Sequence, residues 1–164
     1  MQTFLPYKSF VHSARCLDDQ RLNKQRSEAR DILYLSLRHQ GYDLRDDFKK
    51  TKLQAEKIWL QYQNHPTVKM WIEYDFFLVK YIMAVCSEWK LRKHHDTIQS
   101  KVLNIMKKNF QLFRKIRSPY WLGDEGFHKS HQSNLLRKNK EHYSKFFSVP
   151  DNIKYVWPTE INRL

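Results

Sequence analysis

Glycine is so scarce in this chain that the sequence argues against a β-rich architecture. The 164 residues include three glycines and five prolines. A β-sandwich or barrel needs many tight turns, and glycine and proline supply most of them. Apolar residues instead recur at helical spacing. We therefore predict an all-α fold, with one compact helical domain over residues 1–164, an extended N-terminal arm and an irregular C-terminal segment.

Local signals divide this domain into six predicted helices. Residues 1–10 contain Pro6 and alternate apolar with polar side chains, as in an extended arm. Ser13 is a candidate N-cap for a long first helix that ends before Gly41, and Thr67 opens a strongly apolar helix. The predicted helices span about residues 13–39, 51–62, 67–92, 95–116, 128–137 and 139–147. The tail, residues 148–164, contains two prolines and is predicted to pack as an extended strap.

The charge of the chain indicates a polyanionic partner. Lys and Arg number 30 against 17 Asp and Glu, which gives a net charge of +13. Nucleic acid is the commonest partner of such a protein, and an anionic membrane surface is the rival. No run of 18 apolar residues could span a bilayer, and the start, MQTFLPYKSF, does not resemble a signal peptide. We expect an intracellular protein that binds nucleic acid.

One helical segment combines strong positive charge with a central carboxylate. Glu28 lies in the stretch LDDQRLNKQRSEARDIL. The cationic residues around it are Arg21, Lys24, Arg26 and Arg30. Gln20, Lys24 and Glu28 are four residues apart and share one helix face. The pattern favours a site that binds an anion and moves a proton, although an ordinary surface pair of Lys24 with Glu28 would look the same.

A second polar cluster lies in HKSHQSNLLRKNKEHY, residues 128–143. Its members at three- and four-residue spacing are His128, His131, Asn134, Arg137 and Lys138. They could contact phosphates and bases, with Tyr143 stacking on a base. Two histidines with His142 as a third ligand could instead bind a metal, or the histidines could be structural. The spacing leaves these alternatives open.

Two further segments each have two interpretations. Tyr120 and Trp121 could stack against nucleic acid or fill the core. Asn64-His65-Pro66 could form a turn and helix cap, or His65 could contact DNA. Cys16 and Cys86 are not in a CxxC pair, so we expect neither a zinc finger nor a disulfide framework. We also find no Walker loop, GxSxG or HExxH motif.

The stretch around Glu28 resembles a known family. Asp19-Gln20-x-Leu22, with Glu28 six residues after Leu22, resembles the first helix of the pyrimidine dimer DNA glycosylase / endonuclease V family. MQTFLPYKSFVHSARCLDDQRL, NHPTVKMW, PYWLGDEGFHKSHQSNLLRKNKEHY and YVWP resemble a branch of that family distant from its phage enzyme. This second resemblance covers nearly the whole chain.

The resemblance implies a compact all-α DNA repair glycosylase with AP-lyase activity and no cofactor. Such enzymes kink damaged DNA and flip a base out of the stack. An N-terminal α-amine attacks the sugar C1′ to give a Schiff base, a glutamate assists, and β-elimination cuts the strand. Glu28 matches that glutamate, and Gln20 matches a glutamine that contacts DNA.

The chain departs from the family pattern at its N-terminus and before Glu28. The family nucleophile is the amine of a threonine exposed by removal of the initiator methionine. Here residue 2 is Gln, so we expect Met1 to remain and its amine to attack, with Lys24 as the alternative nucleophile. Ser27 replaces the basic residue that precedes the family glutamate.

The resulting hypothesis is a monomer that acts on double-stranded DNA, with catalysis assigned to Glu28 and Met1. Contact with damaged or distorted DNA is assigned to Gln20, Arg21, Lys24, Arg26, His65, His131, Asn134, Arg137, Lys138 and Tyr143. One alternative is a basic protein that binds distorted or branched DNA without cutting it. The other is a metal-dependent DNA nuclease that uses His128 and His131.

Overall fold

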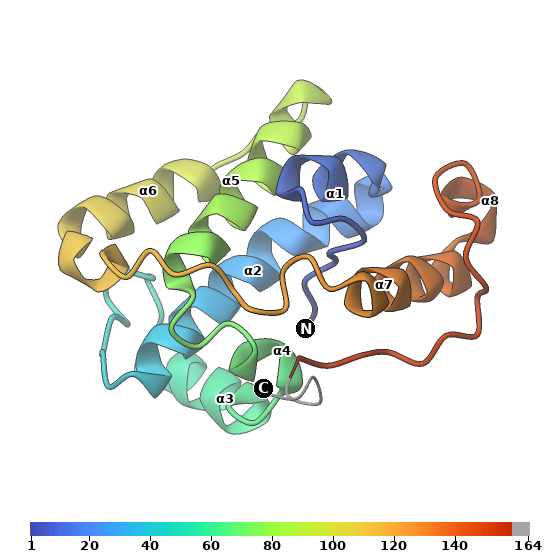
Figure 1. Ribbon diagram of the computed structural model, residues 1–164. Coiled ribbons are helices and arrows are strands. Elements are labelled where there is room, and N and C mark those ends of the chain that lie inside the picture. The colour runs from blue at the N-terminus through green and yellow to red at the C-terminus, as the bar shows by residue number, and fades with distance from the viewer. Residues whose placement is uncertain (159–164) are drawn as a thin grey trace.

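Helices account for the regular structure of residues 1–158, the part of the chain that the computed structural model describes (Figure 1). The elements are α1 (Phe10–Cys16), α2 (Asp19–His39), α3 (Lys52–Tyr62), α4 (Pro66–Lys69), α5 (Asp75–Leu91), α6 (Ile98–Lys108), the 3-10 helix η1 (Phe110–Phe113), α7 (Glu125–Lys138) and α8 (Lys140–Tyr143). No strand occurs within these residues, which confirms the all-α prediction.

The helices α2 and α5 pack against each other at the centre of the molecule (Figure 1). The buried apolar residues of α2 include Leu22, Ala29, Ile32, Leu33 and Leu37. Those of α5 are Leu78, Val79, Tyr81, Ile82, Val85 and Cys86. Both sets recur at three- and four-residue spacing, so each helix presents a continuous apolar surface to its neighbour.

The predicted helix 13–39 is wrong at its start, because it is divided into α1 and α2. Asp18 is extended, with φ −66° and ψ 161°, and its carboxylate accepts the Arg21 N–H at 2.9 Å. A short acceptor that binds a free N–H of the first turn fixes a helix start. Ser9 caps α1, whereas Ser13, the predicted cap, is buried within it.

The predicted helix 67–92 is also divided, into α4 and α5. Residues 70–74 form a turn in which Glu73 has a φ of +69°. Trp71 lies in this turn and is fully buried. The turn between α4 and α5 also carries apolar residues that enter the core. The apolar pattern of the sequence therefore continues across the break, and it does not reveal where one helix ends and the next begins.

The other predicted helices differ from the structure mainly in length. The one at 51–62 is confirmed as α3, which starts with a capping box of Thr51 and Gln54. The one at 95–116 is shorter and becomes α6 followed by η1. The one at 128–137 begins earlier, because Asp124 caps α7.

Trp121 packs in the core, which decides one of the open alternatives. Its side chain is 1 % exposed, and its ring meets Trp71 edge-on at a centroid distance of 5.0 Å. Its indole N–H donates to the Met70 carbonyl oxygen at 3.2 Å. A buried indole needs such a partner. The neighbouring Tyr120 remains exposed.

The predicted C-terminal strap runs extended past α7 as far as the structure describes it, and residues 159–164 lie outside the described part. Ser133 accepts the Ile153 N–H at 3.0 Å, and the Arg137 guanidinium donates to the Ile153 carbonyl oxygen at 3.1 Å. In residues 1–158, no helix is long and apolar enough to cross a membrane. The assignment of 1–164 to one domain stays a prediction.

We expect Asp18→Ala to lower the free energy of unfolding by about 2 kcal/mol, because it removes the cap of α2. It also removes the partner of the Arg21 guanidinium, at 2.5 Å, and the acceptor of the Tyr143 hydroxyl, at 3.0 Å. Asp18→Asn keeps an acceptor for the cap and should lose less. Urea unfolding at pH 7 measures both, and equal stability of all three proteins would contradict the role of the cap.

The difference in unfolding free energy between wild type and Asp18→Asn should depend on pH. Burial alone would raise the pKa of Asp18, but hydrogen bonds from Arg21 and Tyr143 hold it below its ordinary value. The pKa of Asp18 is thus lower in the folded than in the unfolded state. Ionised Asp18 therefore stabilises the fold at pH values above its unfolded-state pKa, and this stabilisation is lost as the pH falls through its folded-state pKa. The stability difference between wild type and Asp18→Asn should therefore close in acid.

Candidate active site

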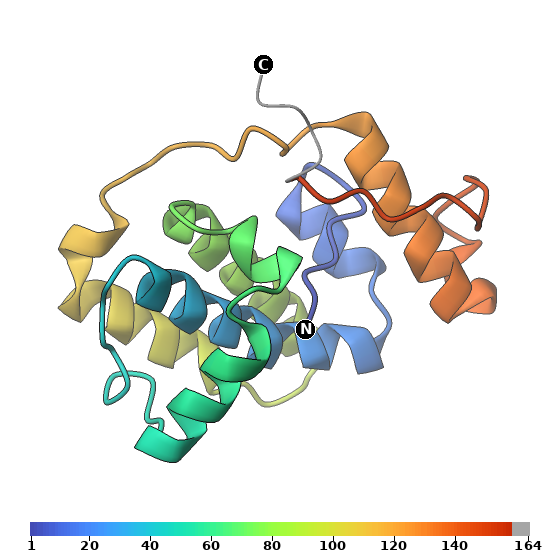
Figure 2. The same ribbon diagram turned by 90° about the horizontal axis from the view of Figure 1, so that it is seen from below.

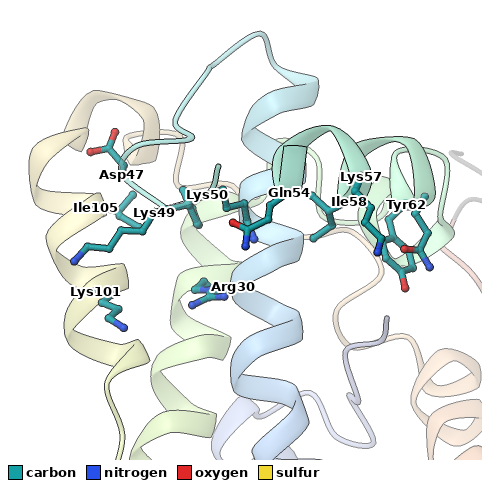
Figure 3. A pocket seen from close by; sticks show the side chains of 12 residues that line it. Arg30, Asp47, Lys49, Lys50, Gln54, Lys57, Ile58, Tyr62, Lys101 and Ile105 are labelled. Carbon is teal, nitrogen blue, oxygen red and sulfur yellow. The ribbon is translucent and has the colours of Figure 1, made fainter. Parts of the chain in front are cut away.

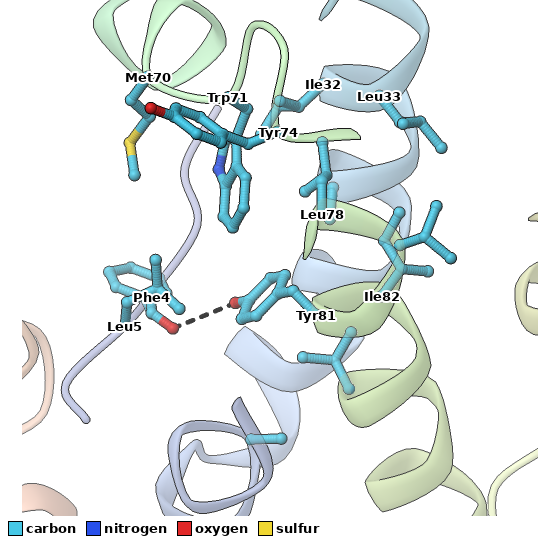
Figure 4. Close-up of a cluster of buried hydrophobic side chains, with 14 of the residues drawn as sticks. Phe4, Leu5, Ile32, Leu33, Met70, Trp71, Tyr74, Leu78, Tyr81 and Ile82 are labelled. Atoms are coloured by element: carbon cyan, nitrogen blue, oxygen red, sulfur yellow. Dashed lines mark hydrogen bonds between the residues drawn. The ribbon is translucent and has the colours of Figure 1, made fainter. Parts of the chain in front are cut away.

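The N-terminal arm, residues 1–9, enters the interior of the protein. Phe4 and Leu5 are buried beside the α2–α5 core, and Figure 4 shows Tyr81 reaching the backbone of Phe4. The N-terminus itself lies among α2, α4 and α7 and not at an outer edge, as Figures 1 and 2 show. The arm belongs to no sheet, so its buried N–H and C=O groups need side-chain partners.

Gln25 of α2 supplies the first of these partners. Its Oε1 accepts the Phe4 N–H at 2.8 Å, and its Nε2 donates to the Gln2 carbonyl oxygen at 3.0 Å. The Tyr81 hydroxyl donates toward Gln25 Oε1 at 2.5 Å and lies 3.2 Å from the Phe4 carbonyl oxygen. Gln25 is fully buried. One amide thus binds both a donor and an acceptor of the arm.

Two histidines of α7 bind the next residue of the arm. His131 Nδ1 accepts the Leu5 N–H at 3.1 Å, and His128 Nδ1 lies 2.7 Å from the Leu5 carbonyl oxygen, to which it donates. Burial lowers the pKa of His128 and places that of His131 well below its ordinary value. Both rings are therefore neutral near pH 7, which suits one acceptor and one donor facing a peptide group.

These contacts correct the metal and DNA assignments of the histidines. His128 Nε2 accepts the Gly123 N–H at 3.0 Å, so both of its nitrogens are engaged. His142 Nε2 lies 2.9 Å from the Cys16 carbonyl oxygen. His131 is fully buried and cannot reach DNA in this conformation. In the described part of the chain, no three His, Cys, Asp or Glu residues are grouped as metal ligands.

Glu28 meets the end of the arm. Its Oε2 accepts the Gln2 N–H at 3.0 Å. The α-amine of Met1 is the next nitrogen along the chain, and adjacent Cα atoms are about 3.8 Å apart. The carboxylate is half-buried at the middle of α2. A proton acceptor and a primary amine therefore share one small region.

A pocket of about 270 Å³ opens at this point, which we call the Glu28 pocket. Its lining residues are Met1, Gln2, Phe4, Gln20, Arg21, Lys24, Gln25, Glu28 and Lys138. Among these residues, Glu28 is the only carboxylate. Three cationic side chains and the amine surround it, so the pocket attracts an anion and offers one group that can accept a proton.

His65 lies near the same amine. It begins α4, and its Nδ1 accepts the Thr67 N–H at 3.1 Å, so the helix-cap interpretation of Asn64-His65-Pro66 is confirmed. Burial lowers the pKa of His65, and the positive N-terminal amine lowers it further. The contact of His65 with DNA stays a prediction.

Six of the predicted site residues line the Glu28 pocket, and the others do not. Met1, Gln20, Arg21, Lys24, Glu28 and Lys138 line the Glu28 pocket. Arg26 forms an ion pair with Asp96 at 2.5 Å and lies over the Trp89 ring. Tyr143 is fully buried, so it cannot stack on a base as predicted. Arg137 binds the strap, and Asn134 is half-buried on α7 outside the pocket.

Sequence reasoning missed Gln25, and a signal for it was present. Gln25 follows Leu22 by three residues and precedes Ala29 by four, so it occupies the apolar stripe of α2. A polar side chain in such a stripe is buried and must find partners. The identity of those partners, the backbone of Gln2 and Phe4, depends on the path of the arm and cannot be read from α2 alone.

Residues 1–102 match the sequence model of one protein family, described as pyrimidine dimer DNA glycosylase. The matched part includes the arm, Gln25, Glu28 and His65, and excludes α7 with Lys138. Searches among curated proteins and among solved structures gave no significant match.

We expect Gln25→Leu to release the arm. The variant leaves the Phe4 N–H without its acceptor and the Gln2 carbonyl oxygen without its donor, which should cost about 2–3 kcal/mol of unfolding free energy. Native-state hydrogen exchange should show lost protection at the Phe4 and Leu5 amides. Gln99→Leu is the control, because Gln99 donates to Ser87 on the surface. Wild-type protection of the arm in Gln25→Leu would refute this role.

Proposed function

The chain belongs to the pyrimidine dimer DNA glycosylase family, and from that premise we propose that it excises a damaged, pyrimidine-dimer-like base from double-stranded DNA and then cuts the strand as an AP lyase. The Met1 α-amine is the nucleophile, and Glu28 is the acid and base. Family membership supports a DNA repair glycosylase with DNA as its substrate. The lyase step and the residue roles are our proposal.

One observation carries this assignment: the hydrogen bond of 3.0 Å from the Gln2 N–H to Glu28 Oε2. It connects the carboxylate to the chain one residue from the amine. An α-amine is a much weaker base than a lysine amine, so a useful fraction is neutral and nucleophilic near pH 7. A carboxylate beside it can accept the proton that the amine loses on attack.

The proposed reaction balances with these two groups. Attack by the neutral amine forms an N–C1′ bond and breaks the bond from C1′ to the base. The base leaves with the electron pair and takes up the proton that the amine gives to Glu28. Opening of the sugar ring, with a proton passing to O4′, gives the imine. Loss of a C2′ proton then expels the 3′ phosphate, and water hydrolyses the imine.

Electrostatics supports the same roles. Positive charge develops on the sugar as the base departs, and a half-buried carboxylate stabilises it. Arg21, Lys24 and Lys138 line the same pocket, which supports their proposed role in binding the flanking phosphates. Arg21 is held by Asp18 and donates to the Lys138 carbonyl oxygen at 3.2 Å, so this part of the rim is ordered.

We expect Glu28→Gln to reduce strand scission by about 10²–10⁴-fold, because the amide cannot accept the proton. Affinity for a duplex with one abasic site should stay within a few-fold of wild type. Glu141→Gln, an exposed change of equal charge on α8, is the control. Scission assays and binding titrations measure both effects. Unchanged scission by Glu28→Gln would remove Glu28 from catalysis.

We expect borohydride to trap a covalent adduct between the protein and an abasic-site duplex in excess EDTA. Only an imine between the two can be reduced to such a covalent protein–DNA adduct. Mass spectrometry should place the adduct on Met1, and acetylation of the α-amine should abolish it. Loss of the adduct in Lys24→Arg would instead identify Lys24 as the nucleophile. Binding without any adduct would favour the non-catalytic DNA-binding alternative, and loss of scission in EDTA would favour the metal nuclease.

A further inference from the structure

A second cavity, of about 570 Å³, lies between α2, α3, α6 and the loop before α3. Figure 3 shows the side chains that line it. Its charged residues are Arg30, Lys49, Lys50, Lys57, Lys101 and Asp47. We call it the basic cavity. It is larger than the Glu28 pocket and shares no lining residue with it.

The positive charge of the basic cavity is only partly neutralised. Asp47 is paired with Lys108 at 2.6 Å. Asp31 serves both Arg30, at 3.3 Å, and Lys50, at 2.9 Å. In residues 1–158, Lys49 and Lys57 have no carboxylate within ion-pair distance. Positively charged side chains this close together repel one another, and a bound anion would reduce that repulsion.

Two local features indicate that the cavity is built for a ligand. Lys49 has a φ of +51°, a conformation that favours glycine, yet this residue is a lysine and lines the cavity. Arg30 Nε is buried and has no hydrogen-bond partner among the described residues. A buried donor without a protein acceptor can bind an anion or a water that enters the cavity.

We propose that the basic cavity binds a backbone phosphodiester of the DNA whose damaged nucleotide occupies the Glu28 pocket. This inference rests on the proposed function and adds a second contact to it. Lysines around an open cavity suit a phosphate, which they recognise as a point charge. The contact carries no sequence information and sets the register of the duplex on the protein.

The position of the cavity connects it with the catalytic end of the arm. The helix α2 lines both sites, through Glu28 in one and Arg30 in the other. Tyr62 lines the basic cavity, and its ring lies 6.1 Å from that of His65. His65 in turn lies near the Met1 amine. We expect a duplex bound at the Glu28 pocket to reach the cavity on one flank of the lesion.

The test removes two exposed lysines of the cavity that lie on different helices, Lys57→Ala with Lys101→Ala. The matched control is Lys80→Ala with Lys107→Ala, which removes the same charge from residues that do not line the cavity. The probe is a duplex with one central abasic site, titrated at several salt concentrations. We expect the cavity variant to bind about tenfold more weakly than the control variant and to have a salt slope lower by about one.

Shortened duplexes then locate the contact. Trimming the duplex on the flank that reaches the cavity should weaken wild-type binding by about the same factor as the cavity substitutions do on the full duplex. The same trimming should not weaken binding by the cavity variant any further. Trimming the other flank should affect both proteins equally. Identical affinity and salt slope of the cavity and control variants would overturn the inference.

Borohydride trapping by the wild-type protein on the same duplex separates this inference from the function on which it rests. Trapping by wild type, together with identical binding of the two variants, would refute the basic cavity and leave the proposed function standing. Failure of the wild-type protein both to bind and to trap would refute both.

Discussion

The active site depends on side chains that satisfy the backbone of a single extended segment. A strand inside a sheet obtains its partners from neighbouring strands, but this all-helical fold offers the arm none. A buried N–H or C=O without a partner costs about 1–3 kcal/mol. Gln25, His128 and His131 remove that cost at Gln2, Phe4 and Leu5. The packing of α2, α5 and α7 thus fixes the position of the N-terminus in the fold.

This arrangement explains why polar residues lie deep in the core. Gln25 and His131 are fully buried, a state that usually weakens a protein. Here each of them pairs with a peptide group that would otherwise be unsatisfied. The neutral state of the two histidines belongs to the same arrangement, because a protonated ring at position 131 could not accept the Leu5 N–H.

Much of the fold and six of the nine residues that line the Glu28 pocket could be predicted from sequence, for identifiable reasons. Scarce glycine and regular apolar spacing indicated helices, and four-residue spacing placed Gln20, Lys24 and Glu28 on one face. Spacing does not show whether a face meets solvent or the core, so His131 and Tyr143 were assigned to DNA although both are buried. The breaks in the long helices come from local caps and turns, which an apolar pattern does not record.

The hydrogen bond from the Gln2 main chain to Glu28 has a consequence for how such a protein can diverge. The contact uses the backbone N–H, so substitution of the side chain at position 2 leaves it intact. An inserted residue between Leu5 and the terminus would instead displace the amine by about 3.3–3.6 Å, as far as the whole distance over which a nucleophile attacks. In this chain the contact between the arm and Glu28 therefore depends more on the number of residues before Leu5 than on the side chain at position 2.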